Sequence, residues 1–187
     1  MGTLTYVMEF ALSTGQTVFE GRKFHVEQRR FEANSVPQVY DVIVHLGAAV
    51  ILPVLDDGRL VLIHNYRIAV DQELLELPAG TLDPGESHAE CAARELTEET
   101  GYRAARLEPL VSFYSSPGIL NERMQVFLAT GLTPGPTAHE AGEQIRVTVL
   151  SHAEAVAAIR DGRITDGKTI LALLYYDRFA RGEGWGS

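Results

Sequence analysis

One segment, GTLDPGESHAECAARELTEETGY, constrains this chain more than any other, because it specifies both a helix and an unusual concentration of negative charge. Ser87 and Glu90 form a capping-box pattern, and Gly101 is a natural helix end. Three alanines and Leu96 recur at helical spacing, which predicts a helix with one face on a core. Like charges three and four residues apart repel, so the glutamates need a positive partner beyond Arg94.

Three of these glutamates, Glu95, Glu98 and Glu99, fall on one side of the expected helix, within an arc of about 100°. Carboxylate oxygens at this spacing suit Mg²⁺, with Mn²⁺ as the other candidate. Arg94 stands four residues before Glu98 and can hold that carboxylate in place. On spacing alone, a solvated acidic helix face is the alternative to a metal site.

The rest of the chain alternates like strands before this helix and mixes strands with helices after it. Asp56-Asp57-Gly58 predicts a hairpin turn between two apolar strands. The order favours an α/β sandwich, with a mixed sheet between helices, over a parallel doubly wound sheet. Strands are expected at residues 16–33, 40–47, 47–55, 59–67, 73–80, 107–116, 123–132 and 145–151, and further helices at 152–162 and 168–180.

Composition excludes several classes of protein. A net charge of −9 over 187 residues argues against a dedicated nucleic-acid binder. The longest apolar run, residues 47–55, is far shorter than a membrane span. A single cysteine, Cys91, permits no internal disulfide and fits a reducing compartment. We therefore expect a cytoplasmic protein without a nucleic-acid or membrane partner.

The acidic segment resembles the Nudix box at every specified polar and glycine position. Gly80, Glu86 and residues 94–101 stand at the box spacings, and Tyr102 is a soft departure, because the family usually has an aliphatic residue there. The resemblance implies the Nudix fold and hydrolysis of a nucleoside diphosphate linked to another moiety. In that family a divalent metal takes up the charge of the box helix.

The resemblance also implies roles for individual residues. It implies a catalytic group of Glu143, Glu98, Glu86 and Arg94, in which Glu86 lies near the metal cluster and Arg94 braces the helix. It implies metal ligands at the Ala79 carbonyl, Glu95, Glu99, Glu98 and Glu143. Glu143 is the expected general base because it precedes Ile145 by two residues, as in related enzymes, and Glu140 is the alternative.

Beyond the box, residues 19–176 resemble the ADP-ribose pyrophosphatase branch of the family. The segments NYRIAVDQELLELPAG, SSPGILNERM and GRITDGKTILALLYY carry this likeness, and Pro117 follows Gly101 by sixteen residues, a spacing associated with ADP-ribose hydrolases. The branch implies cleavage of ADP-ribose to AMP and ribose 5-phosphate. The implied substrate-binding residues are Arg67, Thr81, Ser116, Pro117, Gly118, Glu122, Tyr40, Asp41 and His45.

The N-terminal third departs from that branch in one strand. Tyr40 and Asp41 stand where the branch has Arg-Glu, and Leu46 replaces a proline, whereas His45 and Gly47 match. The identity of the base therefore stays open. A tyrosine can stack on any purine, and an ordinary strand aromatic is the alternative reading.

The chain divides into an expected N-terminal β arm at residues 1–45 and a Nudix hydrolase domain at residues 46–187. As in the resembling branch, the antiparallel arm is expected to cross onto a second copy, which gives a homodimer with swapped strands and a shared base pocket. The expected substrate is a nucleoside diphosphate sugar. The alternatives are a hydrolase of another such sugar, for example GDP-mannose, and a non-catalytic ADP-ribose sensor.

Overall fold

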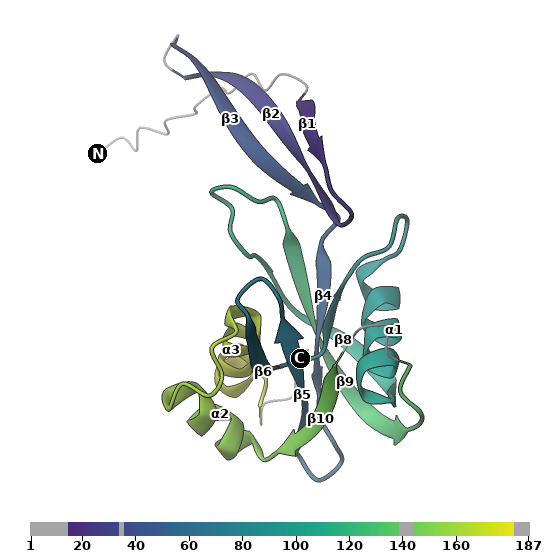
Figure 1. Ribbon diagram of the computed structural model, residues 1–187. Helices are drawn as coiled ribbons and strands as arrows, with labels where there is room; N and C mark the ends of the chain where they lie inside the picture. Colours follow the sequence, from purple (N-terminus) through teal and green to yellow (C-terminus); the bar gives the residue numbers. More distant parts are fainter. Residues whose placement is uncertain (1–14, 34–35, 139–143, 182–187) are drawn as a thin grey trace, which may run out of the picture.

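The computed structural model describes residues 15–33, 36–138 and 144–181, and these residues form three sheets (Figure 1). Two sheets and the helices make up a body, and the third sheet stands away from it as an arm. Within the described ranges, no helix is long and apolar enough to cross a membrane.

The arm consists of three antiparallel strands in the order β1-β2-β3. Their bounds are Gln16–Glu20, Phe24–Ala33 and Val36–His45. Every residue of β1 is exposed, and so is most of β3. Large apolar side chains lie open to solvent on the arm: Val18, Phe19, Phe24, Val36, Val39 and Tyr40. The arm therefore leaves apolar surface that the body of the same chain does not cover.

The body is built around β4, Ala48–Pro53, in which every residue is buried. β4 pairs in parallel with β9 and antiparallel with β7, and β8 completes the order β7-β4-β9-β8. These strands are β7 Ala79–Thr81, β8 Tyr102–Tyr114 and β9 Arg123–Pro134. The second body sheet has the order β10-β5-β6, with β5 Leu60–Arg67, β6 Gln72–Glu76 and β10 Ile145–Leu150.

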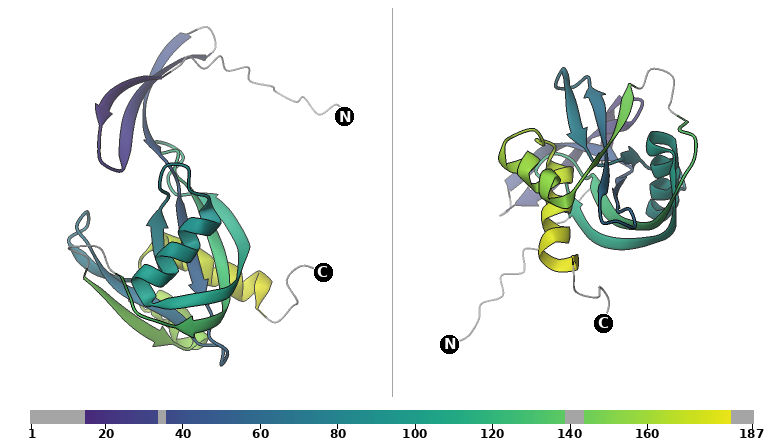
Figure 2. Two further views of the ribbon diagram at one scale, coloured as in Figure 1. Left: turned by 90° about the vertical axis from the view of Figure 1, so that its right-hand side faces the viewer. Right: turned by 90° about the horizontal axis from the view of Figure 1, so that it is seen from below.

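Helices cover the sheets from two sides, as Figure 2 shows. α1, His88–Thr100, packs Leu96, Cys91 and Ala92 into a buried cluster with Ile51 and Phe127 of the central strands. The second buried cluster holds residues of α2, α3 and both body sheets. The helices on this side are α2 His152–Arg160, α3 Gly167–Tyr175 and a π-helical turn, η1 Tyr176–Ala180. The expected sandwich of sheet between helices is confirmed.

The signals that start and stop α1 are also confirmed. Both bonds of the capping box between Ser87 and Glu90 form. Gly101 closes the helix at φ 75°, a left-handed conformation that glycine adopts without steric cost, and its N–H donates to the Thr97 carbonyl.

Two strand expectations were wrong. Residues 73–80 do not form one strand, because Pro78 follows β6 and the chain then enters β7 in the other sheet. The turn at Asp56-Asp57-Gly58 forms, with the Leu55 N–H donating to the Arg59 carbonyl at 2.8 Å. The strands on either side of it nevertheless belong to different sheets and share only the bridge between Val54 and Leu60.

Candidate functional site

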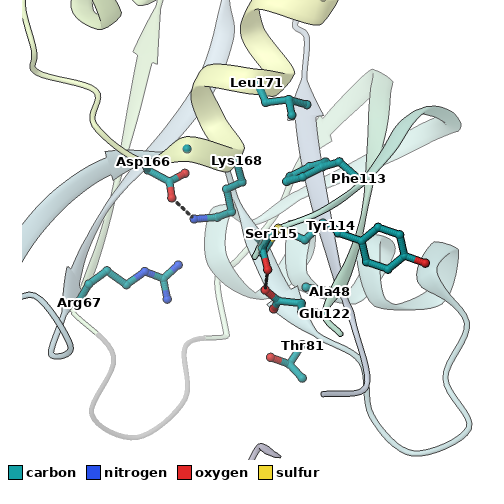
Figure 3. A pocket seen from close by; sticks show the side chains of 14 residues that line it. Ala48, Arg67, Thr81, Phe113, Tyr114, Ser115, Glu122, Asp166, Lys168 and Leu171 are labelled. Carbon is teal, nitrogen blue, oxygen red and sulfur yellow. Dashed lines mark hydrogen bonds and ion pairs between the residues drawn. The ribbon is translucent and has the colours of Figure 1, made fainter. Parts of the chain in front are cut away.

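Two cavities meet at β7. The first, here called the acidic cavity, has a volume of about 510 Å³ and lies between the β1–β2 turn and α1, with Glu95, Glu98 and Glu99 in its wall. The second, the α3 cavity, has a volume of about 560 Å³ and is drawn in Figure 3. Arg67 and residues 79–81 line both cavities, so a ligand at this junction can extend into each of them.

Arg94 is the centre of the charged groups on α1. Its Nε and Nη2 donate to the two carboxylate oxygens of Glu86 at 2.9 and 3.0 Å. Its Nη1 donates to Glu95 at 2.6 Å and to Glu98 at 3.2 Å. Nη2 also reaches the Thr81 carbonyl at 3.2 Å, which fastens α1 to the cavity junction. The sequence prediction that Arg94 holds Glu98 is confirmed as a contact.

The Glu86 carboxylate accepts hydrogen bonds from both Arg94 and the Asp83 N–H. The hydrogen bonds from Arg94 lower the pKa of Glu86 to about 2, and the Asp83 N–H, which donates at 2.9 Å, acts in the same direction. The same pairing raises the pKa of the Arg94 guanidinium above its ordinary value. Glu86 and Arg94 therefore form a charged pair, of which Arg94 lines the acidic cavity.

Glu99 has the opposite electrostatic environment. It is only 3% exposed, and burial raises the pKa of its carboxyl to about 8, with the negative charge of Glu95 adding to the rise. The Ala79 N–H donates to Glu99 at 2.9 Å and fixes the carboxylate against β7. A cation between Glu95 and Glu99 would favour the ionised form of both groups.

The residue types of this cavity fit a hard divalent cation, since carboxylates and a backbone carbonyl are the ligands such ions prefer. Gly80 supports this fit, because a Cβ at this position would lie 1.7 Å from Glu95 Oε1, so glycine alone leaves that carboxylate against the β7 backbone. In the described ranges, no three His, Cys, Asp or Glu side chains converge on one point. Arg94 instead binds Glu95 and Glu98.

The α3 cavity carries a second set of charged groups. Glu76 is fully buried and lies between Arg67 Nη2, 2.6 Å from its Oε1, and Lys168 Nζ, 2.5 Å from its Oε2. Lys168 also contacts Asp166 Oδ1 at 2.9 Å, and Figure 3 shows both side chains in the cavity wall beside Arg67. Asp166 caps α3 by accepting from the Thr169 N–H. Neither Lys168 nor Asp166 was among the predicted site residues.

The loop between β8 and β9 places the expected Glu122 at the α3 cavity, but with Ser115 instead of the expected residues 116–118. Ser115 and Glu122 line the α3 cavity and share a hydrogen bond of 2.6 Å. Ser116, Pro117 and Gly118 are exposed and line neither described cavity. The Ser116 carbonyl instead accepts from the N–H groups of the two residues after Gly118, which closes the turn. Ser115 stands in the same SSPG motif, one residue before the predicted position.

The remaining predicted residues are divided between the cavities and the arm. Thr81 lines both cavities, and His45 lines the acidic cavity, where its backbone N–H donates to Asn121 at 2.7 Å. Tyr40 and Asp41 lie on exposed parts of β3 and line neither described cavity of their own chain. Glu143 and the alternative base Glu140 lie outside the described residues. Sequence reasoning missed Arg22 and Lys23, which line the acidic cavity from the β1–β2 turn.

Comparisons with known proteins agree with this geometry. The NUDIX domain family matches residues 44–173. The chain is 31% identical over 163 residues to the methanol dehydrogenase activator of Bacillus methanolicus, covering 86% of this chain and 88% of the relative. It is 34% identical over 137 residues to the ADP-ribose pyrophosphatase of Bacillus subtilis, covering 72% and 74%.

Two further matches differ in the ligand that their names give. The chain is 38% identical over 138 residues to the GDP-mannose pyrophosphatase of Yersinia enterocolitica, covering 69% of this chain and 72% of the relative. The crystal structure of an ADP compounds hydrolase superposes with a TM-score of 0.82 at 27% identity, covering 96% of this chain and 98% of that one. The shared architecture therefore extends over both the arm and the body.

Proposed function

This chain belongs to the Nudix family, and we propose that it hydrolyses the diphosphate of ADP-ribose to AMP and ribose 5-phosphate. The observation that carries the proposal is the junction of the two cavities at Arg67 and residues 79–81. Carboxylates stand on one side of this junction, and a second cavity of similar volume opens on the other. A diphosphate at the junction would extend its two sugars into separate cavities.

The divalent metal, Mg²⁺ or Mn²⁺, would be held directly by the Ala79 carbonyl, Glu95 and Glu99. Glu98 would bind it through water or orient the cluster, and Glu143 would be a further ligand. When bound, such a metal neutralises the diphosphate and lowers the pKa of a water molecule that attacks it. The protein prepares this site by fixing Glu99 through the Ala79 N–H and by bracing the helix through Arg94 and Glu86. Burial first, and the negative charge of Glu95 second, raise the pKa of Glu99, and a cation at this position would lower it again.

Substrate binding falls to residues around the junction. Arg67 would bind and orient the diphosphate, because its guanidinium lines both cavities and can donate to two oxygens. Glu122, paired with Ser115, offers acceptor oxygens for the hydroxyls of the terminal ribose. The turn at residues 116–118 positions this pair, and Thr81 completes the floor between the cavities.

The general base is proposed to be Glu143, with Glu140 as the second choice. A general base typically contributes about 10²–10⁴-fold, so Glu143→Gln should lower kcat at least about 100-fold with little change in KM. Steady-state kinetics of the Glu143→Gln and Glu140→Gln variants test this assignment. A larger loss in Glu140→Gln would transfer the role to Glu140, and normal rates in both would return it to Glu98.

Residues 1–45 would act as the arm of a homodimer, and residues 46–187 as the hydrolase domain. The exposed apolar side chains of the arm support this division, because a second copy would cover them. Tyr40 and Asp41 would then reach the base in the partner's cavity, with His45 at the boundary. Sedimentation at micromolar concentration should show a dimer, and a fully active monomer would contradict the proposal. The proposed location of this dimer is the cytoplasm.

The second candidate function is hydrolysis of GDP-mannose, which the relative from Yersinia enterocolitica favours. A non-catalytic ADP-ribose sensor is the weaker alternative. That class of protein should have lost the glutamates of the box, whereas Glu95, Glu98 and Glu99 are all present and line the acidic cavity.

A substrate panel tests the proposal directly. ADP-ribose, GDP-mannose and other nucleoside diphosphate sugars are compared by kcat/KM with Mg²⁺, with Mn²⁺ and with EDTA, and the products are identified. We expect ADP-ribose to give AMP and ribose 5-phosphate with the highest kcat/KM, and EDTA to abolish turnover. A higher kcat/KM for GDP-mannose would select the second candidate. Binding of ADP-ribose without any turnover would select the sensor.

A further inference from the structure

A fully buried carboxylate, Glu76 at the end of β6, lies between two cations that are distant in the sequence. Arg67 comes from the end of β5, and Lys168 comes from the first turn of α3. Burial of a charge is costly unless it is paired, so Glu76 needs a cation. Two cations exceed this requirement, and one of them, Arg67, is the residue proposed to bind the diphosphate.

The two cations hold Glu76 in different ways. Lys168 Nζ donates a directed hydrogen bond of 2.5 Å to Oε2, and the lysine side chain is only 10% exposed. Oε1 accepts no hydrogen bond from the described residues, although Arg67 Nη2 lies 2.6 Å away. The N–H groups of Arg67 are therefore not directed at this oxygen, and its side chain is 37% exposed. Lys168 is the hydrogen-bonded partner of Glu76, whereas Arg67 forms an ion pair with Glu76 without a directed hydrogen bond.

The position of Lys168 is itself fixed by the start of α3. The Thr169 hydroxyl accepts from the Leu77 N–H at 2.8 Å, which ties this helix to the residue directly after β6. Asp166 accepts from the Thr169 N–H at 3.0 Å and contacts Lys168 Nζ at 2.9 Å. The lysine thus has a carboxylate on each side and a helix start that is bonded to the strand bearing Glu76.

We propose that Lys168 is a positioning residue for the substrate, because it pairs with Glu76 and so leaves the Arg67 guanidinium available to the diphosphate. The inference rests on the proposed function, in which Arg67 binds that group. Without Lys168, Glu76 would have Arg67 as its remaining cation and would draw the guanidinium into a closed, bidentate pair. A diphosphate would then compete with a buried carboxylate for the same donors, which weakens binding and leaves the chemical step unchanged.

A double-mutant cycle tests whether Lys168 acts through Arg67. Lys168→Met, Arg67→Ala and the double variant are compared with wild type by kcat, KM and melting temperature, with ADP-ribose and Mg²⁺. We expect Lys168→Met to raise KM about tenfold, the effect of one lost charge-assisted hydrogen bond, with little change in kcat. In the Arg67→Ala background, the same substitution should leave KM unchanged.

Two further variants control for stability and charge. Lys168→Arg keeps a cation beside Glu76 and should restore most of the affinity. Arg163→Met removes an exposed ion pair with Asp161 in the segment before α3, and it should leave KM and kcat as in wild type.

Three outcomes would overturn the inference. If Lys168→Met raises KM equally in the Arg67→Ala background, then Lys168 contacts the substrate itself. If it lowers kcat and melting temperature with KM unchanged, then its role is structural only. If KM and kcat both stay normal, Lys168 has no role in binding. Absence of hydrolysis by the wild type would instead reject the proposed function, so the two failures are distinguishable.

Discussion

Two charge clusters face the cavity junction from opposite sides, and the sign of the central group differs between them. The α1 cluster centres on one arginine, and the α3 cluster centres on one buried carboxylate. The members of the α1 cluster are Arg94, Glu86, Glu95, Glu98 and Glu99. The members of the α3 cluster are Glu76, Arg67, Lys168 and Asp166.

The difference shows how one junction can bind both a cation and an anion. The α1 cluster contains more carboxylates than cations, so under the proposed function it would hold a metal ion. The α3 cluster is balanced, yet one of its cations lacks a directed hydrogen bond to Glu76, so donors remain for an anion. The clusters thus differ in net charge, and in the α3 cluster the direction of the hydrogen bonds decides which donors could take a phosphate. Substitutions that change one cluster and spare the other therefore test the comparison.

The largest expected effect comes from Glu99→Gln, which removes a charge from the α1 cluster and keeps an oxygen for the Ala79 N–H. Groups that only support a metal ligand cost about 10–100-fold, so a direct ligand should cost more than about 100-fold in kcat. Steady-state kinetics with Mg²⁺ measure the loss of kcat, and circular dichroism checks that the variant is folded. A folded variant with normal kcat would remove Glu99 from the metal site.

The next effect is expected from Gly80→Ala, which alters the α1 cluster without removing a charge. The new Cβ would occupy the place of the Glu95 carboxylate, so that flexible side chain must swing away from β7. We expect a folded protein with about 10–100-fold lower kcat/KM and weaker dependence on Mg²⁺.

Gly58→Ala is the matched control, because it adds a Cβ at a turn where no atom lies within 4 Å. Its φ of +81° makes the substitution a test of backbone strain alone, which should lower stability and leave kcat/KM unchanged. Equal losses of kcat/KM in the two variants would show that displacement of Glu95 does not explain the effect of Gly80→Ala.

A smaller effect, on stability, is expected from Arg94→Met. It leaves three carboxylates of the α1 cluster without their guanidinium, at a cost of about 1–3 kcal/mol in the free energy of unfolding without metal. Mg²⁺ should then stabilise the variant more than it stabilises wild type, because the ion replaces the lost positive charge. Denaturant unfolding gives the free energy of unfolding of each protein with and without Mg²⁺. An equal increase by Mg²⁺ in wild type and variant would argue against competition between Arg94 and the ion.

The smallest expected effect is the pH dependence of the Glu86 pair. The pKa of the Glu86 carboxyl is about 2 in the folded protein, below the ordinary value of 4.5. The contribution of this carboxylate to the free energy of unfolding is therefore complete above pH 4.5 and is lost as the pH falls toward 2. The difference in melting temperature between wild type and Glu86→Gln should therefore shrink over this range. A difference that stays constant would show that Glu86 is not stabilised by its charge.

Local signals allowed much of the fold to be predicted from the sequence. The capping box at Ser87 and the stop at Gly101 gave the limits of α1, because both act within a few residues. The parallel pairing of β4 with β9 had no such signal, since the paired residues, such as Ala48 and Met124, are 76 positions apart in the chain. The change of sheet at Pro78 was also missed, because the residues on both sides of it favour strands and nothing local shows which sheet each strand joins.

In the site, too, groups within one helix could be predicted, whereas contacts between distant segments could not. The carboxylates of α1 could be placed because helical spacing puts them on one face. The contact between Glu76 and Lys168 joins residues ninety-two positions apart, and no periodicity in the sequence connects them. Ser115 was missed by one residue, because the motif gave the loop and only the hydrogen bond to Glu122 gave the side chain that faces the cavity.

The bond between the Thr169 hydroxyl and the Leu77 N–H has a consequence for the order in which a ribosome delivers this chain. Until α3 emerges, the Leu77 donor has no partner and Glu76 lacks its lysine, so the wall of the α3 cavity stays incomplete. The central sheet likewise waits for β9 before β4 gains its parallel neighbour. The wall of the α3 cavity is therefore completed only after α3, some ninety residues downstream of Glu76, has been synthesised.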